Sequence, residues 1–377
     1  MLSAVLSSVP TRTLSLRRLW LKLHRWLALS VGWVLAAVGL MGALLVVARP
    51  LDQWAHPALF RAATPGAGGL AGGAPLEAIR QRLVERFGND AGFTLRPPRE
   101  PGESLSVAVR GGGWSGTVYL DPQSGAEQGR RGETEGFVNV LFKLHSSLLL
   151  QDTGKALLAW IALAYLFLLA SGLLLWWPRH WPPKLRIELR RGLLRGLFDL
   201  HRTGGALLGL LIAVSVASGA YMAWRPLGEF VTALSGETPV KPPKLPKSAG
   251  ATVGAAPTLD ALVERARAQF PGAALGFIQL AGRADRPLRV RLRLSDDPHP
   301  NGLSSVWLDP RDGAVLAARR WNELDPGARA TAIVYPLHTG ELGGPLLEAL
   351  AMLSGLALGG LGITGLWLWW RRRRRSA

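Results

Sequence analysis

The sequence predicts an α-helical membrane protein: four transmembrane helices in a bundle plus two small α+β domains outside the membrane, arranged as a tandem duplication. Three observations support this fold class. Four runs of 22 residues contain no Asp, Glu, Lys or Arg. The basic residues are concentrated in three short segments between and beyond these runs, and the same series of motifs occurs once in each half of the chain.

The four uncharged runs are long enough to be membrane spans. A helix needs about 20 apolar residues to cross a hydrocarbon core roughly 30 Å thick. Only helices and closed barrels satisfy their backbone hydrogen bonds there. The runs are Leu27–Ala48, Ala156–Trp177, Thr203–Trp224 and Ala349–Trp370. We therefore predict transmembrane helices at residues 27–48, 155–177, 198–224 and 346–370.

The formal net charge of +18 would suggest nucleic-acid binding in a soluble chain. Here the excess lies in residues 1–25, 178–196 and 371–375, whereas residues 49–154 and 225–345 are nearly balanced. Positive charge favours the cytoplasmic side of a membrane. We expect contact with the lipid bilayer and no nucleic-acid partner. The predicted cytoplasmic segments are 1–26, 178–197 and 371–377, and the predicted outer segments are 49–154 and 225–345.

Each outer segment contains one helical pattern followed by alternating strand patterns. Apolar residues at helical spacing predict helices at residues 76–87 and 259–270. In each segment a strand pattern ends in Asp-Pro-x-x-Gly, a sequence typical of a tight turn. We therefore expect each segment to fold as one helix against a short antiparallel sheet. The predicted strands are 104–110, 116–120, 288–294 and 304–308.

Four of the seven histidines occupy equivalent points of the duplicated pattern. His24 and His201 each stand in Leu-His-Arg, and a Gly-Ala step follows each after 18 residues. His145 and His338 each stand in Leu-His-(Ser/Thr), and a (Ser/Thr)-Gly-Leu step begins 26 residues later. The other three, His56, His180 and His299, have no counterpart in the other half, and we expect no ligand role for them.

Histidines repeated near the ends of apolar helices are typical of haem ligation. Two neutral imidazoles on different helices can hold a haem iron with no open position, and such a haem passes single electrons. The predicted topology places His24 and His201 at the cytoplasmic side and His145 and His338 at the outer side. We therefore predict two haem b groups per chain, one for each pair. Because the chain has no cysteine, they are held non-covalently. The alternative is that all four are interfacial histidines without a ligand.

These motifs resemble the PepSY-associated transmembrane family and, within it, inner-membrane ferric-siderophore reductases of the ferrioxamine type. The likeness covers nearly the whole chain. It rests on the Leu-His motifs and on two Val-(Tyr/Trp)-Leu-Asp-Pro-x-x-Gly repeats that begin at Val118 and Val306. The resemblance implies haem b in the bacterial inner membrane, two periplasmic PepSY-like domains, and reduction of ferric chelates on the outer side.

We therefore expect an enzyme, a haem-dependent ferric-siderophore reductase that passes electrons across the membrane and releases Fe(II). The electron donor is left open between a membrane quinol and a cytoplasmic reductase, and no substrate-binding residue is identified. Two alternatives remain. One is a cofactor-free PepSY membrane protein with a binding or regulatory role. The other is an electron feeder for a different periplasmic enzyme.

Overall fold

The computed structural model describes residues 16–64, 72–178, 185, 187–236, 241–246, 256–283 and 285–374. Residues 1–15 and most of the basic stretch 179–186, which includes His180, lie outside the described residues. The chain divides into two compact units. The helical unit comprises residues 1–40, 160–217 and 354–377, and the sheet unit comprises residues 41–159 and 218–353.

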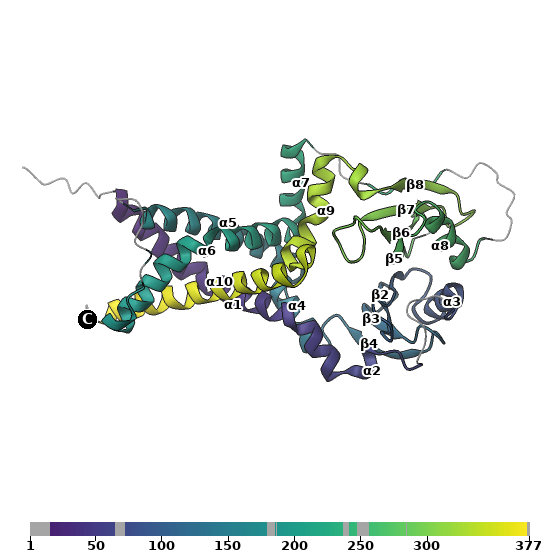
Figure 1. The fold of residues 1–377 in the computed structure, drawn as a ribbon, viewed down its shortest axis with the longest axis horizontal. Coiled ribbons are helices and arrows are strands. Elements are labelled where there is room, and N and C mark those ends of the chain that lie inside the picture. Colours follow the sequence, from purple (N-terminus) through teal and green to yellow (C-terminus); the bar gives the residue numbers. More distant parts are fainter. Residues whose placement is uncertain are drawn as a thin grey trace, which may run out of the picture. The chain divides into compact units, whose positions relative to one another are not determined.

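Four long apolar helices match the four predicted spans (Figure 1). Each is long and apolar enough to cross a membrane, and each extends beyond the uncharged run on which its prediction was based. The predicted span 27–48 lies wholly within its helix, and so does 346–370. The helices are α1 (Leu16–Ala55), α5 (Gln151–Trp176), α6 (Leu193–Ala223) and α10 (Gly344–Arg374).

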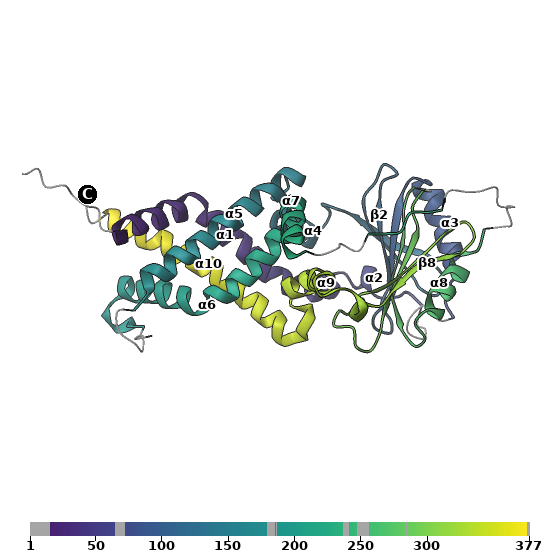
Figure 2. The ribbon, with the colours of Figure 1, turned by 90° about the horizontal axis from the view of Figure 1, so that it is seen from above.

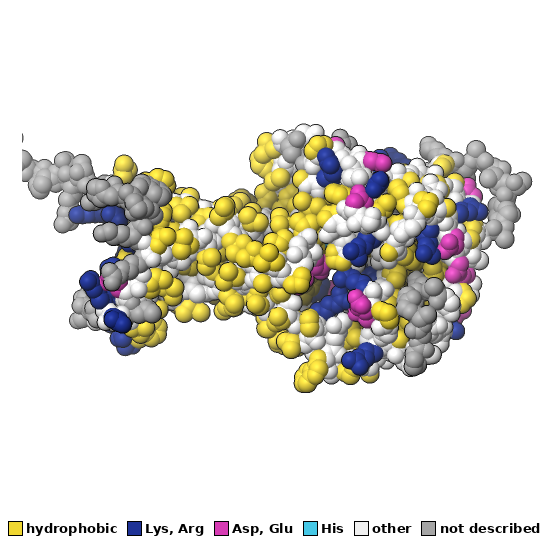
Figure 3. Space-filling view, in the orientation of Figure 1, with side chains coloured by type: hydrophobic (Ala, Val, Ile, Leu, Met, Phe, Trp, Pro, Cys, Tyr) yellow, Lys and Arg dark blue, Asp and Glu magenta, His cyan; other side chains and the backbone are white. Residues whose placement is uncertain are grey.

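Within the helical unit, small residues let two of these helices approach closely. A Cβ atom added to Gly39 of α1 would lie 2.9 Å from the carbonyl oxygen of Gly355 of α10. One added to Gly362 would lie 2.5 Å from the Cβ of Ala36. Helix packing in membranes relies on such contacts. The surface of these helices is mostly apolar (Figure 3). The buried core of this unit contains Leu35, Ile161, Tyr165, Leu168, Ile212 and Leu358.

The sheet unit contains one antiparallel sheet of eight strands in the order β4-β3-β2-β1-β5-β6-β7-β8. The order is symmetric about its central pair, where Phe93 pairs with Leu280 and Leu95 with Ile278. The strands are β1 (Gly92–Arg96), β2 (Leu105–Arg110), β3 (Gly116–Leu120), β4 (Glu127–Gly132), β5 (Ala274–Leu280), β6 (Leu288–Arg293), β7 (Ser304–Leu308) and β8 (Val315–Arg319).

This sheet differs from the two separate short sheets expected from the sequence. The predicted strands are present as β2, β3, β6 and β7, whereas β1, β4, β5 and β8 were not predicted. The difference follows from the pairing of β1 with β5, which fuses the two halves. A strand at the edge of a sheet leaves backbone N–H and C=O groups unpaired, and each half satisfies those of the other.

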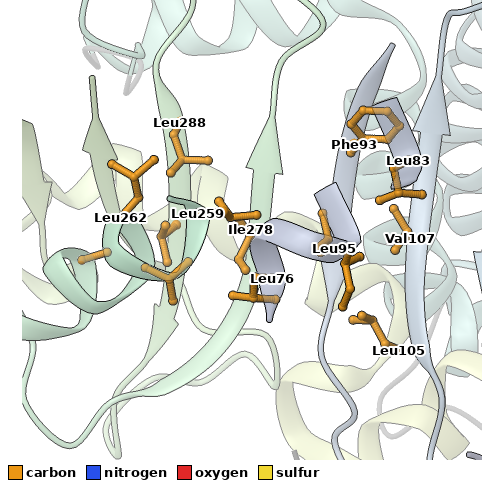
Figure 4. Close-up of a cluster of buried hydrophobic side chains, with 14 of the residues drawn as sticks. Leu76, Leu83, Phe93, Leu95, Leu105, Val107, Leu259, Leu262, Ile278 and Leu288 are labelled. Atoms are coloured by element: carbon orange, nitrogen blue, oxygen red, sulfur yellow. The ribbon is translucent and has the colours of Figure 1, made fainter. Parts of the chain in front are cut away.

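Both predicted outer helices lie on one face of the sheet, as α3 (Leu76–Phe87) and α8 (Leu259–Ala268) (Figure 2). They bury a common core whose members come from both halves (Figure 4). Each helix also caps the other: the backbone N–H of Leu76 donates to Asp260 Oδ1, and that of Leu259 donates to Glu77 Oε2, both at 2.9 Å. Carboxylates at helix N-termini satisfy otherwise unpaired donors. The two halves are therefore joined by both sheet and helices.

The two Asp-Pro-x-x-Gly turns form as predicted. Asp121 Oδ1 accepts hydrogen bonds from the backbone of Gln123 and Ser124, at 2.8 and 2.9 Å. Gly125 and Gly313 close the two turns with φ of 67° and 78°. A positive φ is accessible to glycine without a steric penalty, which explains the residue type at this position.

One short helix precedes the second span in each half of the chain. These helices are α4 (Phe137–Ser147), which carries His145, and α9 (Pro326–Thr339), which carries His338. The turn after α4 uses Leu148 and Leu149 with φ of 51° and 61°, whereas the turn after α9 uses Gly340 with φ of 86°. The remaining short helices are α2 (Pro57–Phe60), α7 (Arg225–Ser235), η1 (Leu189–Arg191), η2 (Trp321–Glu323) and η3 (Glu341–Gly343).

Candidate functional site

In the helical unit, His24 of α1 is held by a hydroxyl from α5. Its Nδ1 lies 2.9 Å from Ser171 Oγ, and that hydroxyl also lies 3.0 Å from the carbonyl oxygen of Leu168. A serine hydroxyl carries one hydrogen. Because the hydrogen is donated to Leu168, Ser171 Oγ accepts from Nδ1–H of His24. The Nε2 atom of His24 is then unprotonated, and its lone pair is available to a metal.

His201 of α6 is held in the same way by α10. Its Nδ1 lies 3.0 Å from Thr364 Oγ1, which donates to the carbonyl oxygen of Gly360 at 2.7 Å. Thr364 therefore accepts from Nδ1–H of His201 and leaves Nε2 unprotonated. The imidazoles on α1 and α6 are thus held alike, each by a hydroxyl from the second span of a half.

A glycine follows each of these hydroxyl residues and lies against the histidine ring. A Cβ atom added to Gly172 would lie 3.4 Å from Cε1 of His24, and one added to Gly365 would lie 3.2 Å from Cε1 of His201. The (Ser/Thr)-Gly step of each second span is therefore the seat for the histidine of a first span. The sequence displayed this step in both halves, but its contact with His24 and His201 was not predicted.

In the sheet unit, His145 and His338 form the second pair. Their ring centroids are 6.1 Å apart and their planes are inclined by 37°. With metal–nitrogen bonds of about 2.0–2.1 Å, two imidazoles that share one metal have centroids roughly 6 Å apart. The observed spacing would therefore let both imidazoles bind one metal ion between them. It also agrees with the pairing expected from the sequence.

The outer pair has glycine seats of its own. A Cβ atom added to Gly42 would lie 2.9 Å from Cε1 of His145, and one added to Gly219 would lie 3.0 Å from Cε1 of His338. Ser218 Oγ lies 3.0 Å from His338 Nδ1, whereas the first half has Met41 at the equivalent position, without a hydroxyl. Gly42 and Gly219 therefore let the rings of His145 and His338 lie against the backbones of α1 and α6.

Each histidine pair offers two imidazole nitrogens as donors. Among the described residues, no three or more His, Cys, Asp or Glu side chains come together as ligands for an ion. A structural zinc site needs four such ligands. A haem iron takes its remaining ligands from the macrocycle, so one histidine pair is sufficient.

The histidines without a counterpart do not join either pair within the described part of the chain. His56 Nδ1 lies 2.8 Å from Asp52 on the surface of the sheet unit. His299 is buried, and its Nδ1 accepts from the backbone N–H of Asn301 at 2.8 Å. These contacts are with neighbouring residues of the same local segment.

Comparison with known families gives one result. A sequence model described as the PepSY-associated TM region matches residues 21–372, which include all four paired histidines and both halves of the sheet. The chain belongs to this family. No match to a curated protein was found. Membership of the PepSY-associated family accounts for the order of spans and outer segments, and the paired histidines are the feature from which its chemistry can be argued.

Proposed function

We propose that this PepSY-associated membrane protein is a di-haem b oxidoreductase that reduces ferric siderophores outside the membrane and releases Fe(II). The observation that carries the proposal is the 6.1 Å spacing of the His145 and His338 rings. His24 and His201 would hold one haem, and His145 and His338 the other. Bis-histidyl haem supplies reversible one-electron chemistry.

The chain's own residues prepare the ligands. Ser171 and Thr364 keep Nε2 of His24 and His201 free of a proton, and Ser218 contacts His338 at the equivalent atom. Such partners orient an imidazole and adjust its basicity. The four seat glycines let the histidine rings lie directly against the helix backbone. The protein thus controls position and potential, whereas the redox chemistry belongs to the cofactor.

The direction of transfer rests on the charge pattern. Basic segments 1–25, 178–196 and 371–375 support an orientation with both termini in the cytoplasm of a bacterial inner-membrane protein and two PepSY-like modules in the periplasm. Electrons would enter at the His24/His201 side from a membrane quinol or a cytoplasmic reductase. Each Fe(III) outside the membrane accepts one electron. Fe(II) binds hard oxygen ligands less tightly and leaves the siderophore.

Oriented membrane vesicles test this proposal. In right-side-out vesicles with reduced protein, an impermeant ferric siderophore should reoxidise the haem, and ferrozine should trap Fe(II) outside. His338→Ala should abolish this reoxidation, whereas the control His56→Ala should retain it. Reoxidation only in inside-out vesicles would reverse the proposed direction. Haem that is reoxidised in neither orientation would favour the electron feeder, and protein without haem would favour the cofactor-free regulatory role.

A further inference from the structure

The face of the sheet opposite α3 and α8 differs between the two halves. On β6 the side chains of Leu288, Val290 and Leu292 enter the core, so Arg289 and Arg291 project from the opposite face, where both are half-buried. The equivalent positions on β2 are Ser106 and Ala108. The second half therefore has two arginines on this face, where the first half has a serine and an alanine.

Aromatic side chains of the neighbouring strands support both guanidinium groups. The Cζ atom of Arg289 lies 5.3 Å from the ring centroid of Trp307 on β7 and 5.7 Å from that of Phe277 on β5. Cζ of Arg291 lies 5.4 Å from the Phe277 ring centroid. Nε and Nη2 of Arg289 both donate to Ser305 Oγ, at 3.2 and 2.9 Å. Stacking on aromatic rings holds a guanidinium group flat, and its remaining N–H groups can donate to a planar anion.

Neither arginine has an anionic partner among the described residues. Within the described part of the chain, no carboxylate oxygen lies within 4.0 Å of either guanidinium group, which is the limit for an ion pair. Nε of Arg291 is buried without a hydrogen-bond acceptor in the described part of the chain. Burial and the nearby charge of Arg289 lower the pKa of Arg291 to about 10, so it stays cationic at neutral pH. Buried cations are normally paired, which indicates that this face receives an anion.

A third arginine extends the cluster toward the first half. Nη2 of Arg99, which follows β1, donates to Asn301 Oδ1 at 2.8 Å. Asn301 lies in the same loop as His299. Burial, together with the charges of Arg291, Arg99 and Arg293, lowers the pKa of His299 to about 4. His299 is therefore neutral and adds no positive charge of its own.

Three carboxylates lie near this cluster, and none forms an ion pair with Arg289 or Arg291 among the described residues. Glu103 Oε2 accepts the backbone N–H of Arg99 at 3.0 Å. Asp297 already accepts backbone N–H groups of Leu294 and Leu303, at 3.0 and 2.9 Å. Glu341 Oε2 lies 4.0 Å from His299 Nε2 and has no hydrogen-bond partner among the described residues.

The cluster borders the helix that carries one outer histidine. His299 stacks on Tyr335 of α9, with ring centroids 6.1 Å apart and an interplanar angle of 26°. Tyr335 precedes His338 by three residues, so both side chains project from the same side of α9. A ligand held by the arginines would thus lie beside the element that positions the outer pair.

We propose that Arg289, Arg291 and Arg99, with Phe277 and Trp307 as their base, bind the acidic surface of a ferric chelate. This inference rests on the proposed function and specifies its substrate class. Carboxylate and catecholate chelators leave ferric complexes with a net negative charge, whereas a complex with three hydroxamates is neutral. Guanidinium groups bind planar, paired oxygens through bidentate hydrogen bonds. We name these five residues the arginine platform, and we assign it to anionic chelates.

Binding of redox-inert gallium(III) complexes tests the arginine platform without any electron transfer. Purified full-length protein in detergent is titrated with a gallium(III) tricatecholate and, separately, a gallium(III) trihydroxamate. The wild type should bind the tricatecholate at least tenfold more tightly. Arg291→Gln and Arg289→Gln should each weaken tricatecholate binding by about tenfold or more and leave the trihydroxamate unchanged. The matched control is Arg283→Gln, because Arg283 pairs with Asp285 at 2.8 Å on the same half.

Further variants separate binding from folding and from the proposed function. Arg291→Lys keeps the charge but loses the bidentate edge, so it should give an intermediate loss even if Arg291→Gln fails to fold. The thermal midpoint of Arg291→Gln, if it folds, should equal or exceed that of the wild type, since a repulsive charge beside Arg289 is removed. Equal affinity for both complexes, or wild-type affinity in Arg289→Gln and Arg291→Lys, would overturn the inference. Selective binding by protein that holds no haem would refute the reductase and leave the arginine platform standing.

Discussion

The two histidine pairs use the same chemistry on different supports. His24 and His201 lie on the long helices α1 and α6, and each rests on a Ser/Thr-Gly step of another long helix. His145 and His338 lie on the short helices α4 and α9, which belong to the sheet unit. The position of the first pair is therefore set by helix packing alone. The position of the second depends also on the fold outside the long helices, so the two pairs should respond differently to mutation.

Removing a ligand should have the largest effect and should separate the pairs. His24→Ala or His201→Ala should abolish one haem, and His145→Ala or His338→Ala the other, so that haem content falls from about two to about one per chain. Pyridine haemochrome assays and redox titrations of purified variants measure this, with His56→Ala as the unchanged control. Loss of the same haem in His24→Ala and His145→Ala would show that the pairs are assigned wrongly.

Removing the hydroxyl partners should have the next largest effect. Ser171→Ala and Thr364→Val remove the acceptors that hold Nδ1–H of His24 and His201. Loss of such a partner typically lowers metal affinity 10–100-fold. We expect the haem of His24 and His201 to be retained less well and its reduction potential to shift. The potential of the haem of His145 and His338 should stay unchanged. Thr364→Ser should restore the retention and the potential of the first haem. An unchanged potential in Ser171→Ala and Thr364→Val would contradict the role given to these hydroxyls.

The seat glycines offer a matched comparison of the pairs. In Gly42→Ala the new Cβ atom would lie 2.9 Å from the His145 ring, too close for the present geometry, whereas in Gly172→Ala it would lie 3.4 Å from His24, an ordinary contact. Overpacking costs about 1–3 kcal/mol, so Gly42→Ala should lower outer haem affinity about tenfold. Gly172→Ala should leave the inner haem in place. Haem retention during dialysis measures both, and equal losses would contradict this difference between the seats.

The smallest effect should come from the caps that join the two halves of the sheet. Asp260→Asn weakens the cap on α3 and should lower the stability of the sheet unit by about 1 kcal/mol. Hydrogen bonding to Arg80 lowers the pKa of Glu77 in the folded state. Its contribution is therefore complete above the unfolded pKa and is lost as the pH falls through the lowered folded value. Thermal unfolding of Glu77→Gln should thus approach that of the wild type at acid pH.

These cap variants also distinguish the two haem sites. Because His145 and His338 belong to the sheet unit and His24 and His201 do not, Asp260→Asn should release the outer haem at a lower temperature and leave the inner haem unaffected. Thermal melts followed in the Soret band measure this. Equal shifts for both haems would show that the two pairs share one support.

The sequence predicted elements whose pattern is local. The helix predicted at residues 76–87 is α3, and the strands predicted at 116–120 and 304–308 are β3 and β7, each ending where an Asp-Pro turn begins. The strands β1 and β5 pair with each other across the two halves, and each also pairs with the strand that follows it in the chain. Their pairing depends on residues nearly two hundred positions apart, which no local pattern reveals.

The candidate site shows the same division. Duplication predicted the four histidines as two pairs, and His145 and His338 lie with their ring centroids 6.1 Å apart. The hydroxyls were visible as repeated Ser/Thr-Gly steps, yet which helix face meets which histidine depends on how the spans are rotated and packed. Arg289 and Arg291 were not identified, because alternating arginines on a strand are also typical of an exposed face.

The central claim is that each histidine pair holds one haem, and the absorption spectrum of the purified wild type tests it most directly. Protein from haem-replete cells is assayed by pyridine haemochrome and by oxidised and dithionite-reduced spectra. The account predicts about two haem b per chain, with a sharp Soret band and split α and β bands on reduction. A colourless preparation, or one with far less than one haem per chain, would contradict it.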